Sequence, residues 1–452
     1  MSSPSEHQKN SPLLSKSLLT PEQNDAVDAL YEANRLVFGK MGVGKTIIAA
    51  TAIAELLDDK ELRRVLIVTT PKIAKTVWAQ EFAKWEHTAH ITVGIATGNP
   101  EQRYNVINNG DNQVVVITFN TLADFCKRGG CKLFDGLLID ESTKLKSPGG
   151  VGFKSLKSKL KKFTWCGALT GTPTSEDFLS LYSQMYLIDG GIALGRSFQR
   201  YKETYFYPTD YKQYNWVLSI GSDRLISEQV KNLIHVVPDY TSELPPINYH
   251  PIYVEPPVDV KDFYATMKKD MVVGDVVAVN AAVLTMKLQQ VASGWAYDED
   301  GDTLRISNFK VEALVEILGD LNSPTIVCYW FQEELAAIKE ALPHAMELNP
   351  ANPLEAVDMW NAGDVDVLLI HPRSAGHGLN LAAGGHNIIW FSPQWSRDLW
   401  EQTNARLWRR GQEHPVDVYT LITDGTIEEA VAERVGDKAK FEKMLLTHLK
   451  TN

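Results

Sequence analysis

The segment RLVFGKMGVGKT (35–46), continued by the helical pattern TIIAATAIAELL (46–57), decides the fold. An apolar strand runs into the loop pattern G-x-x-x-x-G-K-[ST], here Gly39 to Thr46, and a helix follows. Glycines let backbone N–H groups turn inward around phosphate oxygens, and the N-terminus of the helix adds the positive end of its dipole. This order therefore predicts a nucleotide-phosphate site on a parallel α/β sheet.

The chemistry of this loop indicates ATP with Mg²⁺. Lys45 is expected to bridge the β- and γ-phosphates and so to assist catalysis, and the Thr46 hydroxyl to ligate Mg²⁺. A glycine-rich turn that merely precedes Lys-Thr is the alternative, and the strand before it and the helix after it argue against that. The predicted nucleotide-binding residues of the loop are Gly39, Met41, Gly42, Val43, Gly44, Lys45 and Thr46.

An acidic pair, Asp140-Glu141, closes the apolar strand GLLID (136–140). A carboxylate at the end of a strand beside the phosphate loop is placed to hold Mg²⁺, which is the role expected of Asp140. Glu141 is then the candidate that orients and deprotonates the attacking water. A surface turn carrying Asp-Glu is common, so this assignment depends on the buried strand and on the loop upstream.

Short runs rich in Val and Ile alternate with helix-length segments from about Leu18 onward. Such runs describe parallel strands covered by helices on both faces. The first set is RLVFG (35–39), RVLIVTT (64–70), QVVVITF (113–119), GLLID (136–140) and FTWCGALTG (163–171), and the second is TIVCYW (325–330), VDVLLIH (365–371), HNIIWFS (386–392) and VDVYTLI (416–422). Two sets predict two tandem α/β lobes.

The expected boundaries follow from composition. Residues 1–17 read as a short polar, disordered tail. Pro245-Pro246 can continue neither a helix nor a central strand, so lobe one is predicted over 18–248 and lobe two over 249–452. Residues 258–296 are predicted as a helical insertion of lobe two.

The net charge and its distribution along the chain limit which binding partners are expected. The 452 residues carry a net charge of −11, but residues 1–248 hold 28 basic and 26 acidic residues, against 17 and 30 in residues 249–452. A few well-placed cations in a groove suffice for phosphate contacts, so the acidity excludes only a protein that coats DNA tightly without using energy. No apolar run reaches the ~18 residues of a membrane span and no secretory signal is recognisable, so a cytoplasmic location is expected.

Four cysteines, Cys126, Cys131, Cys166 and Cys328, are too few for a disulfide framework. Cys126 and Cys131 are close enough in sequence to share a metal. Plain thiols in a reducing compartment are the favoured interpretation, because no C-x2-C pair with partner histidines is present.

Further segments narrow the class of ATP-binding protein to which the chain is expected to belong. These segments resemble motifs of the SNF2-like group of superfamily 2 helicases, and most closely those of its compact phage-type members, and they occur in the family's order. The segments that carry the resemblance are LTPEQ (19–23, Q motif), LIVTTPKIAKTVWAQEFAKW (66–85, Ia), VVVITFNTLA (114–123, Ib), DEST (140–143, II), LTGTP (169–173, III), TIVCYWFQEELAAIKEAL (325–342, IV), SAGHGLNL (374–381, V) and QTNARLWRRGQ (402–412, VI). The resemblance runs from about residue 18 to 435.

The resemblance implies two RecA-like lobes that share one ATP site. Gln23 would read the adenine edge and Gly378 would belong to the nucleotide site. Arg406 and Arg409 would be arginine fingers reaching ATP from lobe two, and their spacing of three predicts one helix face. A solvated basic helix face is the alternative for these arginines.

The resemblance also implies residues that couple the ATP site to movement and residues that contact DNA, the track of the motor. Thr170, Thr172 and Gln402 would couple the ATP site to movement. Phosphate contacts to DNA are expected from Lys72, Lys75, Arg373 and Ser374, as sequence-independent backbone contacts.

Two positions depart from the family pattern. Gly39-Lys40 stands where Asp-Glu is usual before the loop, and motif II ends in Thr143 where His is commoner. The lysine-rich segment 154–162 is interpreted as a solvated helix face or a DNA-facing patch. Trp78, Trp85, Trp395, Trp400 and Trp408 are expected in the core or in lobe packing rather than as base-stacking platforms.

The predicted function is ATP-driven translocation on DNA, mostly double-stranded, with remodelling of DNA structures or protein–DNA complexes. A strand-separating or branch-migrating helicase, including an RNA helicase, is the alternative within the motor class. An ATP-switched nucleic-acid-binding protein is the alternative of another class. A P-loop kinase or metabolic ATPase leaves the second lobe unexplained.

Overall fold

The computed structural model describes residues 13–40, 42–171, 177–213, 215–238, 244–273, 276–277, 281–298, 300–348, 353–373 and 379–433, with Leu445 and Leu449. The chain divides into two compact units, lobe one with residues 1–239 and 440–452, and lobe two with residues 240–439. The division lies before the boundary expected at 248. The C-terminal end also differs from expectation, because Leu445 and Leu449 pack in the core of lobe one.

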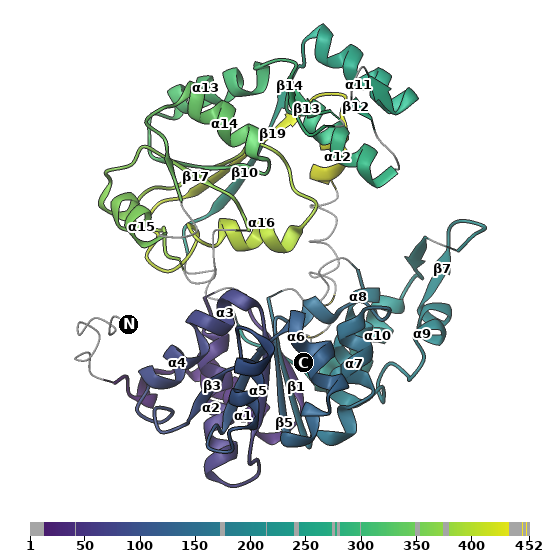
Figure 1. Cartoon of the computed structure of the whole chain (residues 1–452), viewed down its shortest axis with the longest axis vertical. Coiled ribbons are helices and arrows are strands. Elements are labelled where there is room, and N and C mark those ends of the chain that lie inside the picture. The colour runs from purple at the N-terminus through teal and green to yellow at the C-terminus, as the bar shows by residue number, and fades with distance from the viewer. Residues whose placement is uncertain are drawn as a thin grey trace. The chain divides into compact units, whose positions relative to one another are not determined.

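Lobe one is built on a seven-stranded sheet in which all neighbouring strands are parallel (Figure 1). Across the sheet, the order is β3 (Val93–Ile95), β4 (Val114–Thr118), β2 (Val65–Thr69), β5 (Gly136–Asp140), β6 (Trp165–Thr170), β1 (Arg35–Phe38) and β9 (Ile234–Val236). The five strands predicted for this lobe are confirmed, while the short edge strands β3 and β9 were not predicted.

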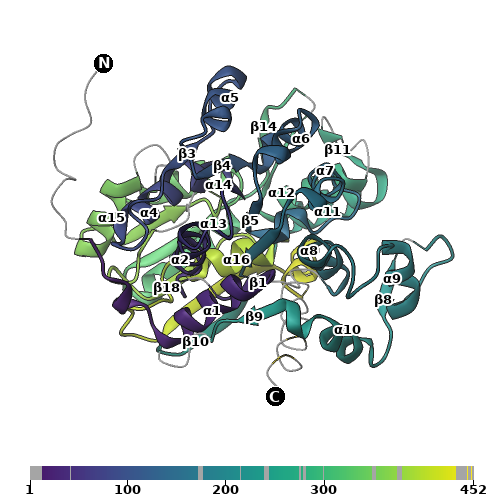
Figure 2. The same cartoon turned by 90° about the horizontal axis from the view of Figure 1, so that it is seen from below.

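The central strands are buried on both faces, which explains their apolar runs. Every residue of β2 and β4 is buried, as expected for parallel strands covered on both sides. Figure 2 shows α1, α2 and α4 on one side of the sheet and α6, α7 and α8 on the other. The helices of lobe one are α1 (Pro21–Glu32), α2 (Lys45–Asp58), α3 (Pro71–Thr76), α4 (Trp78–Lys84), α5 (Pro100–Asn108), α6 (Phe119–Lys127), α7 (Val151–Lys157), α8 (Leu179–Asp189), α9 (Phe198–Tyr205) and α10 (Ser222–Val230).

The prediction of a disordered tail over residues 1–17 is wrong for its last residues. The Leu14 N–H donates to the Lys84 carbonyl at 2.9 Å, and the Glu86 N–H donates to the Leu14 carbonyl at 3.0 Å. A short 3₁₀ helix, Lys16–Leu18, follows. These backbone bonds attach residues 13–18 to lobe one, and residues 1–12 lie outside the described part of the chain.

A β-hairpin lies beside α9 at the end of lobe one remote from β3 (Figures 1 and 2). Its strands are β7 (Phe206–Pro208) and β8 (Trp216–Leu218), paired antiparallel. The Lys202 ammonium of α9 lies 4.2 Å from the centre of the Trp216 ring. This cation–π contact attaches the hairpin to the helix that precedes it.

Lobe two has a six-stranded, all-parallel sheet with β10 at one edge. The order is β10 (Ile247–Val254), β19 (Val416–Thr423), β18 (Asn387–Trp390), β15 (Thr325–Cys328), β17 (Val367–Ile370) and β16 (Met346–Glu347). The four predicted strands are confirmed. Pro251 is accommodated in β10 because an edge strand has one side without ladder bonds.

Alternate residues of each strand face opposite layers of lobe two. Ile326 and Cys328 pack with α15, whereas Val327 packs with α13 and α14. Outside the insertion, the helices of this lobe with described bounds are α13 (Phe309–Leu321), α14 (Gln332–Ala341), α15 (Pro353–Ala362) and α16 (Arg397–Asn404), and residues 427–433 are also helical. Within the described residues of the chain, no helix is both long and apolar enough to cross a membrane.

The insertion between β10 and β15 is longer than the helical segment expected at 258–296. It consists of α11 (Val258–Asp270), β11 (Val272–Val273), β12 (Val276–Val277), α12 (Ala281–Ala292), β13 (Trp295–Tyr297) and β14 (Thr303–Arg305). Two small antiparallel hairpins therefore accompany the two helices.

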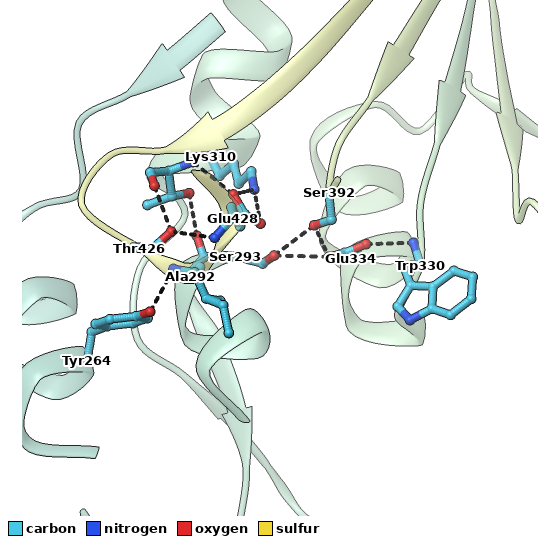
Figure 3. A network of polar contacts seen from close by, with 11 residues as sticks. Tyr264, Ala292, Ser293, Lys310, Trp330, Glu334, Ser392, Thr426 and Glu428 are labelled. Carbon is cyan, nitrogen blue, oxygen red and sulfur yellow. Dashed lines mark hydrogen bonds and ion pairs between the residues drawn. The ribbon is translucent and has the colours of Figure 1, made fainter. Parts of the chain in front are cut away.

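Buried polar contacts fasten this insertion to the sheet (Figure 3). Thr423, at the end of β19, donates its hydroxyl to the Ala292 carbonyl of α12 at 2.7 Å. The Ile427 N–H donates to the Tyr264 hydroxyl of α11 at 2.7 Å. Both insertion helices are thus hydrogen-bonded to the segment that follows β19.

A second part of the network centres on the buried Glu334 carboxylate of α14. It accepts from the Ser293 hydroxyl at 3.0 Å, the Ser392 hydroxyl at 2.6 Å and the Trp330 N–H at 2.7 Å (Figure 3). Burial raises the pKa of Glu334, while the Ser392 hydroxyl and the Trp330 N–H oppose the shift. The network joins the insertion to the segments that follow β15 and β18.

One ion pair in this region is entirely buried. The Lys310 ammonium lies 2.6 Å from the Glu428 carboxylate, and both side chains are 0% exposed. The carboxylate also accepts the Thr423 N–H at 2.8 Å. Removing one partner would leave the other charge buried without compensation.

We therefore expect Lys310→Met to lower the free energy of unfolding by about 3–5 kcal/mol, the range for one lost partner of a buried pair. The exposed pair Arg305–Glu340 of the same lobe is the matched control, and Arg305→Met should cost less than about 1 kcal/mol. Urea denaturation of both variants measures the difference. Equal losses for the two substitutions would contradict the structural importance of the buried pair.

Candidate functional site

The loop between β1 and α2 takes a conformation that requires glycine. Gly42 has φ 88° and Gly44 has φ 83°, both in the left-handed region. Gly44 is also the N-cap of α2. A Cβ atom at this position would lie 2.4 Å from the Gln23 amide nitrogen. The left-handed backbone therefore favours glycine at position 44, and a Cβ there would also displace the end of the Gln23 side chain. Met41 lies outside the described residues.

Gln23 supports this loop from α1. Its side-chain oxygen accepts the Thr20 N–H at 2.9 Å, and its amide nitrogen donates to the Val43 carbonyl at 3.0 Å. The first contact belongs to the capping box of α1. The side chain therefore connects a helix start to the glycine-rich loop, and adenine recognition by Gln23 stays a prediction.

Lys45 lies at the start of α2 and folds back over the loop. Its ammonium donates to the Gly39 carbonyl at 2.5 Å and to the Lys40 carbonyl at 3.0 Å. Burial lowers the pKa of Lys45, and the neighbouring Glu141 and Asp140 carboxylates oppose that shift. The lysine, the loop and the acidic pair therefore form one electrostatic unit.

Backbone hydrogen bonds join the three strand ends around this unit. The Gly39 N–H, just after β1, donates to the Thr170 carbonyl at the end of β6 at 3.1 Å. The Glu141 N–H, just after β5, donates to the Leu169 carbonyl of β6 at 3.1 Å. Thr170 is itself fully buried. Motifs I, II and III, far apart in sequence, thus meet at the carboxyl edge of the sheet, where α/β folds bind ligands.

Asp140 is the last residue of β5, and its carboxylate is held by two neutral donors. The Thr69 hydroxyl lies 2.8 Å and the Trp78 indole nitrogen 3.0 Å from the same oxygen, Oδ2. Burial raises the pKa of Asp140, while Thr69, Trp78 and Lys45 oppose the shift.

Glu141 follows in a left-handed conformation with φ 71°. A non-glycine residue in this region stores strain that is common at functional sites. The Thr143 hydroxyl donates to the Glu141 carboxylate at 2.8 Å, and the Ser142 hydroxyl donates to Gln184 at 2.6 Å. The threonine that departs from the usual motif II therefore orients the candidate general base within its own lobe.

The residues present fit ATP and Mg²⁺. The left-handed glycines leave room for phosphate oxygens beside backbone N–H groups, and Lys45 supplies a cation next to them. Thr46, in the first turn of α2, and the buried Asp140 carboxylate provide oxygen ligands of the type that Mg²⁺ prefers.

The arginines of motif VI lie outside the helix on which they were expected. Helix α16 ends at Asn404, and Arg406 and Arg409 follow in consecutive turns. The helix prediction was wrong because the N–H groups of Arg406 and Leu407 bond three residues back, to the Thr403 and Asn404 carbonyls, and not four residues back as in an α-helix. Gln402 does lie in α16, half-buried.

Lobe two fixes these arginines through its backbone. An Arg409 guanidinium nitrogen donates to the Leu379 carbonyl at 3.0 Å. Arg406 is 5% exposed, and among the described residues its buried Nε has no hydrogen-bond partner. Burial, together with the neighbouring Arg409, lowers the pKa of Arg406 to about 10. Two guanidinium groups are thus held close together without a described carboxylate partner.

Gln412 has a structural role that sequence reasoning missed. Its side-chain nitrogen donates to the carbonyls of Ala382 at 3.1 Å and Gly385 at 2.9 Å, and its oxygen accepts the His414 N–H at 3.0 Å. The glutamine that ends motif VI thereby fastens it to the segment after motif V. The predicted site residues Thr172, Ser374 and Gly378 lie outside the described residues.

The candidate DNA contacts lie on both lobes. Lys72 and Lys75 are exposed on α3, and Arg373 is exposed in the turn after β17. The Arg373 guanidinium lies 4.6 Å from the centre of the Trp330 ring, which stacks on His371 with centroids 5.1 Å apart. Arg373 is therefore presented on an aromatic support. In the lysine-rich segment 154–162, the Lys157 ammonium lies 4.2 Å from the centre of the Tyr186 ring, which is a cation–π contact.

The cysteine prediction is confirmed for buried thiols. Cys126 and Cys131 lie with sulfurs 3.4 Å apart, and all four cysteines are free and buried. Within the described part of the chain, no group of three or more His, Cys, Asp or Glu side chains is arranged to hold a metal.

Trp78 and Trp85 are buried in lobe one, as expected, whereas Trp395, Trp400 and Trp408 are half-buried in lobe two. Trp78 is 0% exposed and Trp85 is 7% exposed. In lobe two, Trp395 donates to Gln289 at 3.0 Å, Trp408 donates to the Pro245 carbonyl at 2.8 Å, and Trp400 lies beside Tyr249. What sequence reasoning missed is that Trp78 also contacts the motif II carboxylate.

Comparisons of the sequence with a family model and with known proteins point to the same family. The SNF2-related domain matches residues 22–293. The chain is 29% identical to "Putative protein p41" of Acyrthosiphon pisum secondary endosymbiont phage 1, over 95% of this chain and 98% of that protein. It is 26% identical to an "Uncharacterized ATP-dependent helicase" of Mycoplasma genitalium, over 90% of this chain and 40% of that protein.

A third relative is a "DNA repair and recombination protein RAD54-like" of Drosophila ananassae, 23% identical over 96% of this chain and 63% of that protein. The chain thus spans nearly all of the phage protein but less than two thirds of each of these two cellular relatives.

The glycine requirement at position 44 is testable. We expect Gly44→Ala to weaken binding of a fluorescent ADP at least ~10-fold, since an unfavourable backbone conformation alone costs about 1–3 kcal/mol. Gly110→Ala is the control, because a Cβ there meets nothing within 4 Å. Equilibrium titration measures both. Wild-type affinity in Gly44→Ala would contradict the assignment of the loop as the phosphate cradle.

Proposed function

Because the chain belongs to the SNF2-related domain family and is an ATP hydrolase of that type, we propose that it is a motor that couples ATP hydrolysis to movement along duplex DNA. The observation that carries the proposal is the convergence of the glycine-rich loop, Lys45, Asp140 and Glu141 at one edge of the first sheet. Lobe two also has an all-parallel sheet, and in this proposal it would contribute Arg406 and Arg409 to the site.

Hydrolysis at a γ-phosphate is mainly positioning and charge stabilisation. When bound, Mg²⁺ would offset the negative charge of the phosphate groups. Thr46 and Asp140 would hold the ion, and Lys45 would exchange its backbone carbonyl contacts for phosphate oxygens. Glu141, oriented by Thr143, would align the attacking water and accept its proton.

Arg406 and Arg409 are proposed as the cations that complete this site from lobe two. A buried guanidinium group next to a second, half-buried one is costly unless an anion joins them. A triphosphate is such an anion, and arginine binds phosphate bidentately. ATP would then favour the closed pair of lobes and hydrolysis would release it, with Thr170, Thr172 and Gln402 as the coupling residues.

The proposed track is the phosphate backbone of DNA. The RAD54-like relative is named as a DNA repair and recombination protein, which supports DNA as the polymer. Lys72 and Lys75 on lobe one, with Arg373 and Ser374 on lobe two, would hold phosphates without reading bases. Two sets of phosphate contacts on two lobes would let each ATP cycle shift one set relative to the other.

A strand-separating helicase is the second candidate, since the Mycoplasma genitalium relative is named as an ATP-dependent helicase. The two candidates differ in which polymer stimulates ATP turnover. A duplex translocase responds most to double-stranded DNA, whereas a strand-separating enzyme responds most to single strands or RNA. An ATP-switched binding protein would show slow turnover with all three.

The roles of Glu141 and Arg409 are testable together. We expect Glu141→Gln or Arg409→Ala to reduce duplex-stimulated ATP turnover at least ~10²-fold, as a positioned base and an arginine finger contribute. Turnover is measured with duplex DNA, single strands and RNA side by side. Arg410→Ala, at the exposed neighbouring position, is the control and should stay close to wild type. Stimulated turnover retained by both site variants would end this assignment.

Arg373 is expected to act on DNA binding and not on ATP binding. Arg373→Ala should weaken duplex binding several-fold for any sequence and lower the slope of log affinity against log salt by about one. Fluorescence anisotropy across a salt series measures both values. Arg305→Ala, which removes another exposed arginine of lobe two, is the control. An unchanged salt slope in Arg373→Ala would show that this residue binds no phosphate.

A further inference from the structure

Trp78 carries a function beyond packing. The side chain is 0% exposed and lies at the start of α4, packed against Phe82 with ring centroids 6.2 Å apart. A tryptophan in such a position usually fills a core. Here its one polar atom, the indole N–H, is aimed at the Asp140 carboxylate with the nitrogen 3.0 Å from Oδ2.

Thr69 completes the arrangement from the neighbouring strand. It is the last residue of β2, is 0% exposed, and donates its hydroxyl to the same oxygen at 2.8 Å. Two donors from two elements therefore fix the plane of one carboxylate. Because both bind Oδ2, neither of them uses Oδ1.

The chemical nature of these donors suits a metal-binding carboxylate. An indole N–H donates but cannot accept, so it favours the ionised acid as its partner. Neither donor carries a charge, so neither competes with a cation for the charge of the carboxylate. Outer donors of this kind orient metal ligands, and their loss typically lowers metal affinity 10–100-fold.

We propose that Trp78, with Thr69, is a positioning residue that holds the Asp140 carboxylate in the orientation that Mg²⁺ requires. The proposal rests on the proposed ATP site and deepens it. It assigns part of the Mg²⁺ affinity of this enzyme to motif Ia, a segment otherwise expected to serve the track. Movement of α3 or α4, which lie next to each other, would then alter how the metal is held.

The test is nucleotide binding as a function of Mg²⁺, without turnover. A fluorescent ADP is titrated into the full chain at a series of free Mg²⁺ concentrations and also in EDTA. For Trp78→Phe and Thr69→Val we expect the Mg²⁺ concentration at half-maximal enhancement of binding to rise ~10-fold. Affinity in EDTA should stay at the wild-type value.

Two control variants separate positioning from loss of structure. Trp85→Phe removes an indole of the same segment whose N–H bonds to Glu81 at 3.0 Å, away from the site, and should keep the wild-type Mg²⁺ dependence. Thr69→Ser retains the hydroxyl and should restore most of what Thr69→Val loses.

Two results would overturn the proposal. The first is unchanged Mg²⁺ dependence in both Trp78→Phe and Thr69→Val. The second is an equal loss of affinity with and without Mg²⁺, which a merely structural role produces. If instead Mg²⁺ fails to enhance ADP binding even in the wild type, the proposed ATP site itself is wrong, and the positioning role is refuted with it.

Discussion

The turn from β1 into α2 is the constraint on which lobe one depends. Gly44 must be left-handed and without a side chain, and Gln23 occupies the space beside it. Strand β6 holds the start of this turn through the Thr170 carbonyl and holds Glu141 through the carbonyl of the residue before it. One strand thereby sets the spacing between the phosphate loop and the acidic pair, so any shift of β6 would move both halves of the site together.

Buried charge is handled in two different ways in the two lobes. In lobe two, Lys310 and Glu428 neutralise one another inside a closed network, which stabilises the docking of the insertion and leaves no charge for a ligand. In lobe one, Asp140 is surrounded by neutral donors and lies near Lys45, whose ammonium is bonded to carbonyls. The first arrangement is complete by itself, whereas the second has charge available for an ion and phosphates. This contrast is what marks the second as functional.

Sequence reasoning identified the elements that have strong local patterns. The predicted strands of both sheets are confirmed, because parallel strands buried on both faces read as continuous apolar runs. It missed the two-residue strand β16 and the three-residue strands β3 and β9, which are too short to show a period. It also missed the eight-residue edge strand β10, whose Pro251 argues against a strand in sequence. It also extended the helix of motif VI to the arginines, because a spacing of three is equally compatible with the turns that follow Asn404.

By itself the sequence determined the α/β class, the two lobes and the residues of the phosphate loop, since these depend on local pattern and on the geometry that glycine permits. Only the tertiary structure decided that Trp78 contacts Asp140, that Thr143 orients Glu141 and that Gln412 fastens motif VI. Such contacts depend on the directions of side chains from different elements. A buried tryptophan shows the same apolar signature in sequence whether or not its N–H meets a carboxylate.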